Sequence, residues 1–293
     1  MTEKRKGEIY IFLELILWAF FPIIAFISYN KLPSLISLTW STLISAFFFV
    51  PIIFYKKSFH EFKNILLWKY SLGVVLFIGI IYYGLYYIGL ESTTAGNASV
   101  LATFEIFTSF VFFNLLRKES FSKEYKLGAF LMILGVLIVL FPNFSHPKIG
   151  DFFIILATIF SPMGNMFQQK AKKIASTETI LFLRSFLSAI FFFVLSFILK
   201  DTQTVFNIKD SLLILFINGI IVFGFSKLFW IEAISRMSVT KAISLNSAGP
   251  FVTLIFSWII LSQQPTFYQI FAMIPLMFGV FLLTDNLKFK KSK

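Results

Sequence analysis

The second half of the chain repeats the first at an offset of about 144 residues, and this repeat constrains the fold more than any other feature. Aligned segments are Asn97-Ala98 with Lys241-Ala242, Glu105-Ile106-Phe107 with Gly249-Pro250-Phe251, Leu134-Gly135-Val136 with Phe278-Gly279-Val280 and, at an offset of 143, Gly7-Glu8 with Gly150-Asp151. Each half carries five apolar segments. Because five is odd, the second copy must enter a bilayer in the opposite orientation. Inverted repeats of this kind are typical of secondary transporters, which bind substrate between the two copies.

The composition indicates a polytopic membrane protein. The chain is 58% hydrophobic and only 14% charged, with a mean hydropathy of +0.84. A soluble domain has no way to hide that much apolar surface. Cysteine is absent, which excludes disulfides, thiolate catalysis and cysteine metal sites. The first apolar run is long enough for a full span, and no small-residue cleavage site follows it, so we expect no cleavable signal peptide.

A helix needs about 20 apolar residues to cross a bilayer. Ten segments come close to this length, at residues 8–29, 33–54, 69–89, 95–116, 125–142, 150–170, 178–199, 211–233, 240–261 and 266–285, numbered here as spans 1 to 10. We therefore predict an all-α integral membrane protein with ten transmembrane helices in two inverted five-helix repeats. The expected domains are residues 1–146 for the first repeat and 147–293 for the second.

The basic residues indicate the orientation in the membrane. Twenty of the 26 Lys and Arg residues fall in segments on the same side of the membrane as the N-terminus. Four fall on the other side, and two lie within spans. Cytoplasmic loops carry such an excess, so both termini are predicted to be cytoplasmic. The net charge of +12 then reflects topology, with lipid headgroups as partners and no nucleic acid. We expect a multi-pass protein of the cell membrane, meaning the inner membrane of a bacterium or archaeon.

Several short patterns recur in the later spans of each copy. They are Tyr86-Tyr87-Ile88-Gly89-Leu90, residues 92–98, residues 115–119, Gly128 and Leu134-Gly135-Val136 in the first copy, and residues 229–234, Thr240-Lys241-Ala242, Pro250-Phe251 and Phe278-Gly279-Val280 in the second. Together with the ten spans, these residues make the chain similar to the EamA branch of the drug/metabolite transporter superfamily. One departure is the Leu-rich Gly-Glu stretch usual after spans 4 and 9. It reads Leu116-Arg117-Lys118-Glu119 and Leu261-Ser262-Gln263-Gln264 here, so the second copy lacks the acid.

The resemblance implies transport of small organic solutes, such as amino acids, metabolites or drugs, often outward. It also implies a central cavity lined by spans 1, 3, 4, 6, 8 and 9, with spans 5 and 10 at the periphery.

Ionisable side chains are rare inside the predicted spans, where each costs about 2.5–3.5 kcal/mol to insert. Among the acids, only Glu14 and Glu105 lie clearly inside, and both His60 and His146 are in loops. The spans hold no HExxH motif, no pair of carboxylates on one helix and no Ser-His-Asp set. We therefore expect no enzyme, no catalytic residue, no metal site and no cofactor.

Span 1 places an acid, an indole and a proline on one helix face, since Glu14, Trp18 and Pro22 are spaced by four residues. Pro22 is expected to kink the helix. This face suits a solute that bears an amine. Two alternatives remain open: Glu14 carries a proton, or it only pairs with a neighbouring Lys for assembly.

Span 6 is the repeat counterpart of span 1 and holds Pro162, Asn165 and Gln168. Pro162 and Asn165 are three residues apart and share a face. Helix breaks at equivalent positions of spans 1 and 6 would indicate a binding site. The alternative is a kink that serves packing alone.

Span 4 presents Asn97 and Glu105 on one stripe. Span 9 carries Asn246 and Pro250, which are spaced by four, and Pro250 is a candidate for a gate or helix break. A carboxylate near the middle of a bilayer is expected to face protein or a cavity and not lipid. Glu105 is therefore predicted either to line the cavity or couple a proton, or to make a hydrogen bond between helices.

Arg184 in span 7 and Lys227 in span 8 lie about as deep as Glu14, roughly 9 Å from the inner end by helix rise. One acid and two cations at one level would form an inner gate that breaks and reforms. The alternative is snorkelling of both long side chains to the interface. Trp230 lies near Lys227 on the same face, and Tyr83, its repeat counterpart, is a candidate for the cavity wall.

These features predict a secondary active transporter, by resemblance an exporter, of a small polar or amphipathic organic solute such as an amino acid, amine or metabolite. It would work by alternating access about a central cavity. No ATP-binding motif is present, so a gradient must supply the energy, with Glu14 and Glu105 as the candidate proton carriers. The alternatives are a membrane subunit or scaffold without transport activity, and a flippase of lipid-linked substrates. The protein is expected to be a monomer or homodimer.

Overall fold

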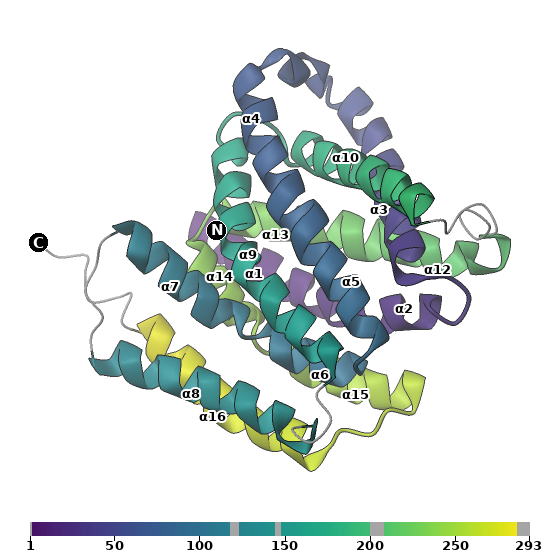
Figure 1. Ribbon diagram of the computed structural model, residues 1–293. Helices are drawn as coiled ribbons and strands as arrows, with labels where there is room; N and C mark the ends of the chain where they lie inside the picture. The colour runs from purple at the N-terminus through teal and green to yellow at the C-terminus, as the bar shows by residue number, and fades with distance from the viewer. Residues whose placement is uncertain (1, 118–122, 144–147, 200–207, 286–293) are drawn as a thin grey trace, which may run out of the picture.

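The computed structural model describes residues 2–117, 123–143, 148–199 and 208–285. Over these ranges every regular element is a helix and no strand occurs, which confirms the all-α prediction (Figure 1). Four features predicted from sequence lie outside the described residues. These are the boundary between residues 146 and 147, His146, the Lys118-Glu119 turn and the basic C-terminal tail.

The helices of the first half are α1 (Glu3–Ala19), α2 (Phe21–Ser28), α3 (Ser34–Tyr55), α4 (Ile65–Val74), a π-helical segment (Val75–Tyr82), α5 (Tyr83–Glu91), α6 (Ala95–Ala102), α7 (Glu105–Arg117) and α8 (Lys123–Leu140). Those of the second half are α9 (Ile149–Lys172), α10 (Thr177–Ile198), α12 (Leu212–Phe216), a π-helical segment (Ile217–Ser226), α13 (Lys227–Ile234), α14 (Val239–Asn246), α15 (Gly249–Leu261) and α16 (Phe267–Asp285). Short 3₁₀ turns occupy Ser58–Lys63, Phe141–Asn143 and Lys209–Ser211.

Eight helical segments among the described residues are long and apolar enough to cross a membrane. They cover predicted spans 1 to 4 and 6 to 9. Predicted spans 5 and 10 correspond to two shorter apolar helices, Lys126–Leu140 and Phe267–Leu283. The observed segments thus agree with a count of ten, which stays a prediction together with the cytoplasmic termini.

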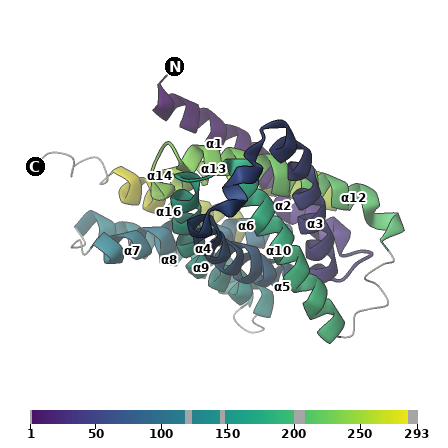
Figure 2. The same cartoon turned by 90° about the horizontal axis from the view of Figure 1, so that it is seen from above.

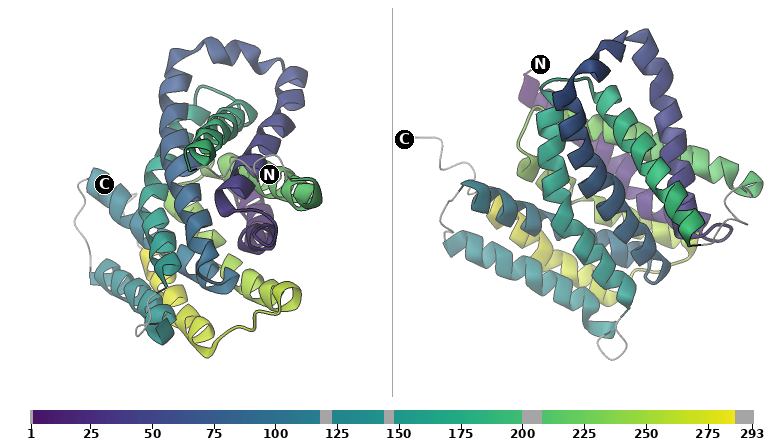
Figure 3. Two further views of the ribbon diagram at one scale, coloured as in Figure 1. Left: turned by 45° about the vertical axis from the view of Figure 1, so that its right-hand side comes forward. Right: turned by 45° about the horizontal axis from the view of Figure 1, so that its top comes forward.

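Helices α8 and α16 form a separate pair at one side of the molecule (Figures 1 and 3). Glycine allows their backbones to approach closely, since a Cβ on Gly279 would lie 2.9 Å from the carbonyl oxygen of Gly128. Spans 5 and 10 are therefore peripheral, as the resemblance implied. The other helices enclose the polar interior, and Figure 2 shows α4, α5, α9 and α10 from above.

Interruptions recur at equivalent places in the two halves. Span 4 is broken at residues 103–104, between α6 and α7, and span 9 at residues 247–248, between α14 and α15. The π-helical segments of spans 3 and 8 end at Tyr82 and Ser226, so that Tyr83 and Lys227 begin the helices that follow. These positions are related by the same offset of 144. Breaks and π-turns are frequent at functional sites in membrane helices.

The repeat symmetry fails between spans 1 and 6. Span 1 is interrupted at Phe20, two residues before Pro22, which the sequence predicted to kink this helix. The break expected at Pro162 is wrong, because α9 runs unbroken through it. Proline leaves the carbonyl four residues earlier without its helical donor. Here that carbonyl, of Thr158, accepts a hydrogen bond from the Thr108 hydroxyl at 2.7 Å, which stabilises the continuous helix.

A second hydroxyl–carbonyl contact joins the repeats at the equivalent interface. Thr253 in α15 donates to the carbonyl of Ala19, the last residue of α1, at 2.7 Å. Span 4 thus bonds to span 6 as span 9 bonds to span 1. Such contacts fix the two repeats against each other where helix backbones are interrupted.

Candidate functional site

A small cavity lies at the centre of the bundle, where both repeats meet. Nine predicted site residues line it: Glu14, Trp18, Tyr83, Glu105, Asn165, Gln168, Lys227, Trp230 and Asn246. Arg184 of α10 also lines it, so span 7 contributes to the wall in addition to the six spans that the resemblance implied. The cavity has a volume of about 50 Å³, room for only a few water molecules.

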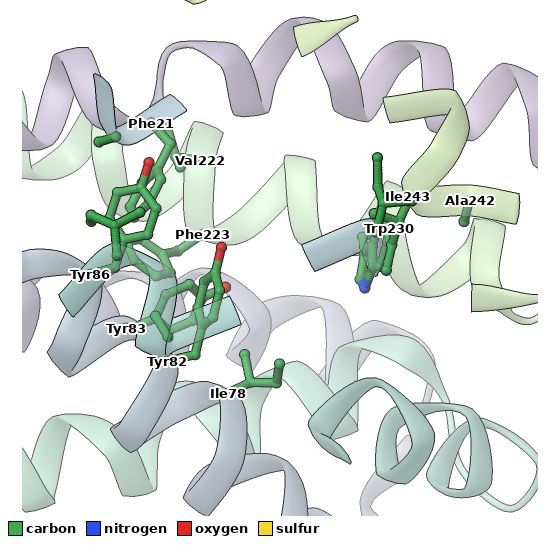
Figure 4. Packing of buried hydrophobic residues seen from close by; sticks show 14 of the residues in the cluster. Phe21, Ile78, Tyr82, Tyr83, Tyr86, Val222, Phe223, Trp230, Ala242 and Ile243 are labelled. Carbon is green, nitrogen blue, oxygen red and sulfur yellow. The ribbon is translucent and has the colours of Figure 1, made fainter. Parts of the chain in front are cut away.

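Buried aromatic side chains gather in two groups in this region. Figure 4 shows Tyr82, Tyr83 and Tyr86 together with Phe21 and Phe223 on one side, and Trp230 with Ile243 on the other. Tyr83 and Phe223 rings meet edge to face with centroids 4.8 Å apart. Packed aromatic rings hold such a wall rigid.

Glu14 and Lys227 form a buried ion pair across the repeats. Lys227 Nζ donates to Glu14 Oε1 at 2.7 Å, and the two side chains are 8% and 0% exposed. The same ammonium group lies 3.1 Å from the centroid of the Trp18 ring. Ser226 also donates to Glu14 Oε1, at 3.3 Å. The acid, indole and cation predicted for spans 1 and 8 therefore lie together.

Glu105 is held by neutral donors. Ser161 donates a short hydrogen bond to Glu105 Oε1, and Asn165 Nδ2 donates to the same oxygen at 3.1 Å. Asn165 Oδ1 in turn accepts from Trp230 Nε1 at 3.1 Å. Glu105 is the first residue of α7, directly after the break in span 4, where the helix dipole favours an anion.

Arg184 is 1% exposed, so it does not snorkel to the interface. Its guanidinium carbon lies 5.5 Å from the centroid of the Tyr83 ring, and its Nη2 lies 3.4 Å from the carbonyl oxygen of Phe223. A guanidinium group stacked on an aromatic ring is a recurrent cation–π arrangement. Arg184 thus places a second cation on the cavity wall.

Four buried polar atoms on the cavity wall have no hydrogen-bond partner among the described residues. They are Glu14 Oε2, Gln168 Oε1, Asn246 Oδ1 and Arg184 Nη1. Buried polar atoms are nearly always paired, so unpaired ones gathered round one cavity indicate a site that a ligand or water completes. Three of the four are acceptors, and one is a donor.

A second cavity, of about 60 Å³, adjoins the first and shares Trp18, Tyr82, Glu105, Ile243 and Asn246 with it. It is lined by both predicted helix-break prolines of spans 1 and 9, Pro22 and Pro250. Its further lining residues lie toward the ends of spans 4 and 9 that the charge pattern places outside. The two cavities therefore lie next to each other, and residues of spans 1, 3, 4 and 9 line both.

Two predicted residues do not reach either cavity. Asn97 Oδ1 accepts from Gln269 Nε2 of α16 at 2.6 Å, so its amide ties span 4 to span 10. Pro162 lies in the unbroken α9. Ser161, a polar residue of span 6 that was not among the predicted site residues, donates to Glu105. Its position next to Pro162, and its alignment with Trp18 at the offset of 143, were the signals in the sequence.

Ion pairs join the repeats at the end that the charge pattern places in the cytoplasm. Lys241 pairs with Glu8 at 2.8 Å and Arg236 with Glu3 at 3.0 Å. A third pair, Lys172 with Glu232 at 2.6 Å, lies within the second repeat. The hydrogen bond from Lys6 holds the pKa of Glu3 below its ordinary value, and Arg236 acts in the same direction. The Glu3–Arg236 and Glu8–Lys241 pairs hold α1 against the second repeat at this end.

Comparisons with known proteins agree with this architecture. The EamA-like transporter family matches twice, at residues 5–141 and 148–285. A protein named as an uncharacterized transporter in Synechocystis sp. is 22% identical over 222 residues, which are 72% of this chain and 64% of that protein. The chain thus spans less than two thirds of that relative's length. A solved crystal structure of a protein covers 99% of this chain and all of its own, with a TM-score of 0.72 at 15% identity, which shows a shared fold. With both halves matched, this multi-pass membrane protein belongs to the EamA-like transporter family.

Proposed function

We propose that the protein is a secondary active transporter of a small polar or amphipathic organic solute, such as an amino acid, amine or metabolite. The two repeats rock about the central cavity, which opens alternately to the two sides. The family supports transport in general, and the substrate, the outward direction and the coupling ion are our proposals.

One observation carries this proposal: a cavity between the repeats walled by two carboxylates, two cations and four unpartnered polar atoms. Buried charge of this kind is costly in a membrane protein and marks substrate or ion pathways. A scaffold subunit would gain nothing from leaving these polar atoms unpaired.

The volume of the cavity supports a moving mechanism. Pockets for organic ligands of drug size measure about 300–1,000 Å³. The central cavity and its neighbour have volumes of about 50 and 60 Å³, so the helices must separate before a solute enters. The broken and π-helical segments of spans 3, 4, 8 and 9 supply places where the helices bend.

Proton coupling fits Glu105 better than Glu14. Glu14 is neutralised by Lys227, whereas the hydrogen bonds that Glu105 accepts come from uncharged Ser161 and Asn165. A carboxyl with neutral partners can gain and lose a proton without breaking an ion pair. We therefore assign the proton to Glu105 in the proposed cycle.

The test is a thermal-shift screen of the purified protein against amino acids, polyamines, nucleosides and choline-like amines, followed by flux measurements in proteoliposomes with each stabilising solute. Ligand at 100 times its Kd stabilises by about 2.7 kcal/mol, a clear rise in Tm. Flux must fall in Arg184→Ala and persist in Glu178→Gln, a buried carboxylate paired with Lys56 away from the cavity. If no solute stabilises the protein and none crosses the membrane, the transport proposal is wrong.

A further inference from the structure

The ammonium group of Lys227 occupies a site with the chemistry of a ligand-binding cation site. Its Nζ contacts Glu14 Oε1 at 2.7 Å and the face of Trp18 at 3.1 Å from the ring centroid. The centroid of the Trp230 ring lies 6.0 Å away. Carboxylates combined with indole faces are the groups by which proteins bind ammonium ligands. The ammonium group of a free solute would find the same partners there.

The site has more acceptors than Lys227 uses. A primary ammonium group has three N–H donors, and Lys227 spends one on Glu14. Glu14 Oε2, Gln168 Oε1 and Asn246 Oδ1 line the same cavity without a hydrogen-bond partner in the described part of the chain. An ammonium group that is not tethered to α13 is free to take a position nearer to these oxygens.

A second carboxylate lies on the wall of the same cavity. Glu105 lines this cavity together with Lys227, and the hydrogen bonds that it accepts come from the neutral Ser161 and Asn165. The Trp230 ring beside Lys227 donates to Asn165, which also donates to Glu105. The flexible four-carbon stem of a lysine lets its ammonium group move while the helix stays in place.

We propose that Lys227 is a tethered cation that fills an ammonium subsite in the empty carrier, and that a substrate with a primary ammonium group displaces it from Glu14 toward Glu105. This inference rests on the proposed transport function and names its substrate class. Lys227 keeps Glu14 neutralised whenever the site holds no substrate. Because an unpaired buried carboxylate is strongly unfavourable, this substitute cation makes the return of the empty carrier across the membrane easier.

Binding of a simple amine tests the subsite without any transport step. The purified full-length protein is titrated calorimetrically with n-butylammonium chloride, whose chain matches the end of a lysine, and with n-butanol as the neutral counterpart. In Lys227→Met the subsite is vacant, so n-butylammonium must bind about tenfold more tightly than in the wild type. Adding Glu14→Gln to that variant must abolish the gain. Lys56→Met, which removes a cation at the protein surface, must bind as the wild type does.

Loss of Lys227 leaves Glu14 unpaired, so Lys227→Met is purified with and without n-butylammonium, which should raise its Tm more than that of the wild type. If the variant does not fold, Lys227→Arg replaces it. A guanidinium group holds a carboxylate with two parallel hydrogen bonds, so the amine must bind several-fold more weakly than in the wild type. An amine affinity that is unchanged in a folded Lys227→Met or Lys227→Arg protein overturns the proposal.

The same experiment separates this inference from the proposed function. Tighter amine binding in Lys227→Met, combined with no flux of any solute in proteoliposomes, leaves the subsite standing and removes the transporter. Flux of solutes in the wild type, combined with amine binding that ignores Lys227, leaves the transporter and removes the tethered cation.

Discussion

Lys227 donates a hydrogen bond to Glu14 at 2.7 Å, although the two residues are 213 positions apart and lie in different repeats. This pair has no counterpart at the positions that the repeat makes equivalent. Lys227 aligns with Tyr83 and Glu14 aligns with Ala157, so the two equivalent positions cannot form an ion pair. Both deep acids belong to the first repeat and both deep cations to the second. Charge attraction thus draws the repeats together at one level of the membrane.

Removing either partner of this pair alone is expected to destabilise the protein strongly. Glu14→Gln and Lys227→Met should each lower the free energy of unfolding by about 3–5 kcal/mol, because each leaves an uncompensated buried charge. The double variant should lose far less than the sum. A double-mutant cycle by denaturant unfolding in detergent measures this coupling. The partly exposed Glu8–Lys241 pair, which also joins the repeats, should show a coupling of only about 0.2–1 kcal/mol. Equal couplings in the two pairs would contradict the burial argument.

Glu105→Gln is expected to separate transport from proton coupling. The glutamine amide still accepts hydrogen bonds from Ser161 and Asn165 through its oxygen, but it cannot take up or release a proton as the carboxyl group does. Substrate flux in proteoliposomes should then lose its stimulation by a pH gradient while flux down a substrate gradient continues. Glu178→Gln is the matched control, since Glu178 is a buried glutamate that pairs with Lys56 away from the cavity. Unchanged stimulation in Glu105→Gln would remove Glu105 from the coupling step.

The spans and most of the site could be predicted because hydropathy and charge are local signals. An acid inside a span is rare enough to single out, and Glu14, Glu105 and Lys227 indeed line the cavity. The repeat then relates residues of the two halves. What it cannot show is whether a given proline interrupts its helix, since that depends on a donor from another span.

The failures are therefore tertiary in origin. Pro162 leaves α9 intact because Thr108 bonds to the carbonyl that it frees. The break in span 4 contains no proline from which it could be predicted. At this break the Thr103 hydroxyl donates a hydrogen bond to the carbonyl oxygen of Val100. The position of Arg184 along span 7 could not show whether its side chain is buried or snorkels to the interface. Its burial depends on contacts from other helices, namely the face of the Tyr83 ring and the carbonyl oxygen of Phe223.

The role of Thr108 can be tested by removing the proline that requires it. Thr108→Val keeps the shape of the side chain and should cost about 1 kcal/mol of unfolding free energy. In a Pro162→Ala background the new N–H of residue 162 bonds to the Thr158 carbonyl, and the cost should nearly vanish. Thr253→Val, whose partner is the Ala19 carbonyl, should cost the same in both backgrounds. Equal losses from Thr108→Val in the two backgrounds would show that Thr108 does not compensate for Pro162.

The absence of cysteine makes the topology directly measurable. Two single-cysteine variants, Lys31→Cys and His60→Cys, place a thiol at exposed positions between spans. Intact cells are treated with a membrane-impermeant maleimide that labels accessible thiols. The ten-span arrangement places Lys31 outside and His60 inside. Lys31→Cys should therefore react in intact cells, and His60→Cys only after the membrane is opened. The reverse pattern would invert the predicted orientation.

Gly150 tests how closely the repeats must approach at the end predicted to be outside. A Cβ on Gly150 would overlap the backbone carbonyl oxygen of Gly89, whereas the nearest atom to a Cβ on its counterpart Gly7 would be the end of the flexible Met237 side chain, at 2.7 Å. Gly150→Ala must therefore push α9 from α5 and should cost about 1–3 kcal/mol. Gly249→Ala, where nothing lies within 4 Å, should leave stability unchanged or raise it slightly. Thermal unfolding of the two variants measures the difference, and a Gly150→Ala protein as stable as Gly249→Ala would show that this contact opens freely.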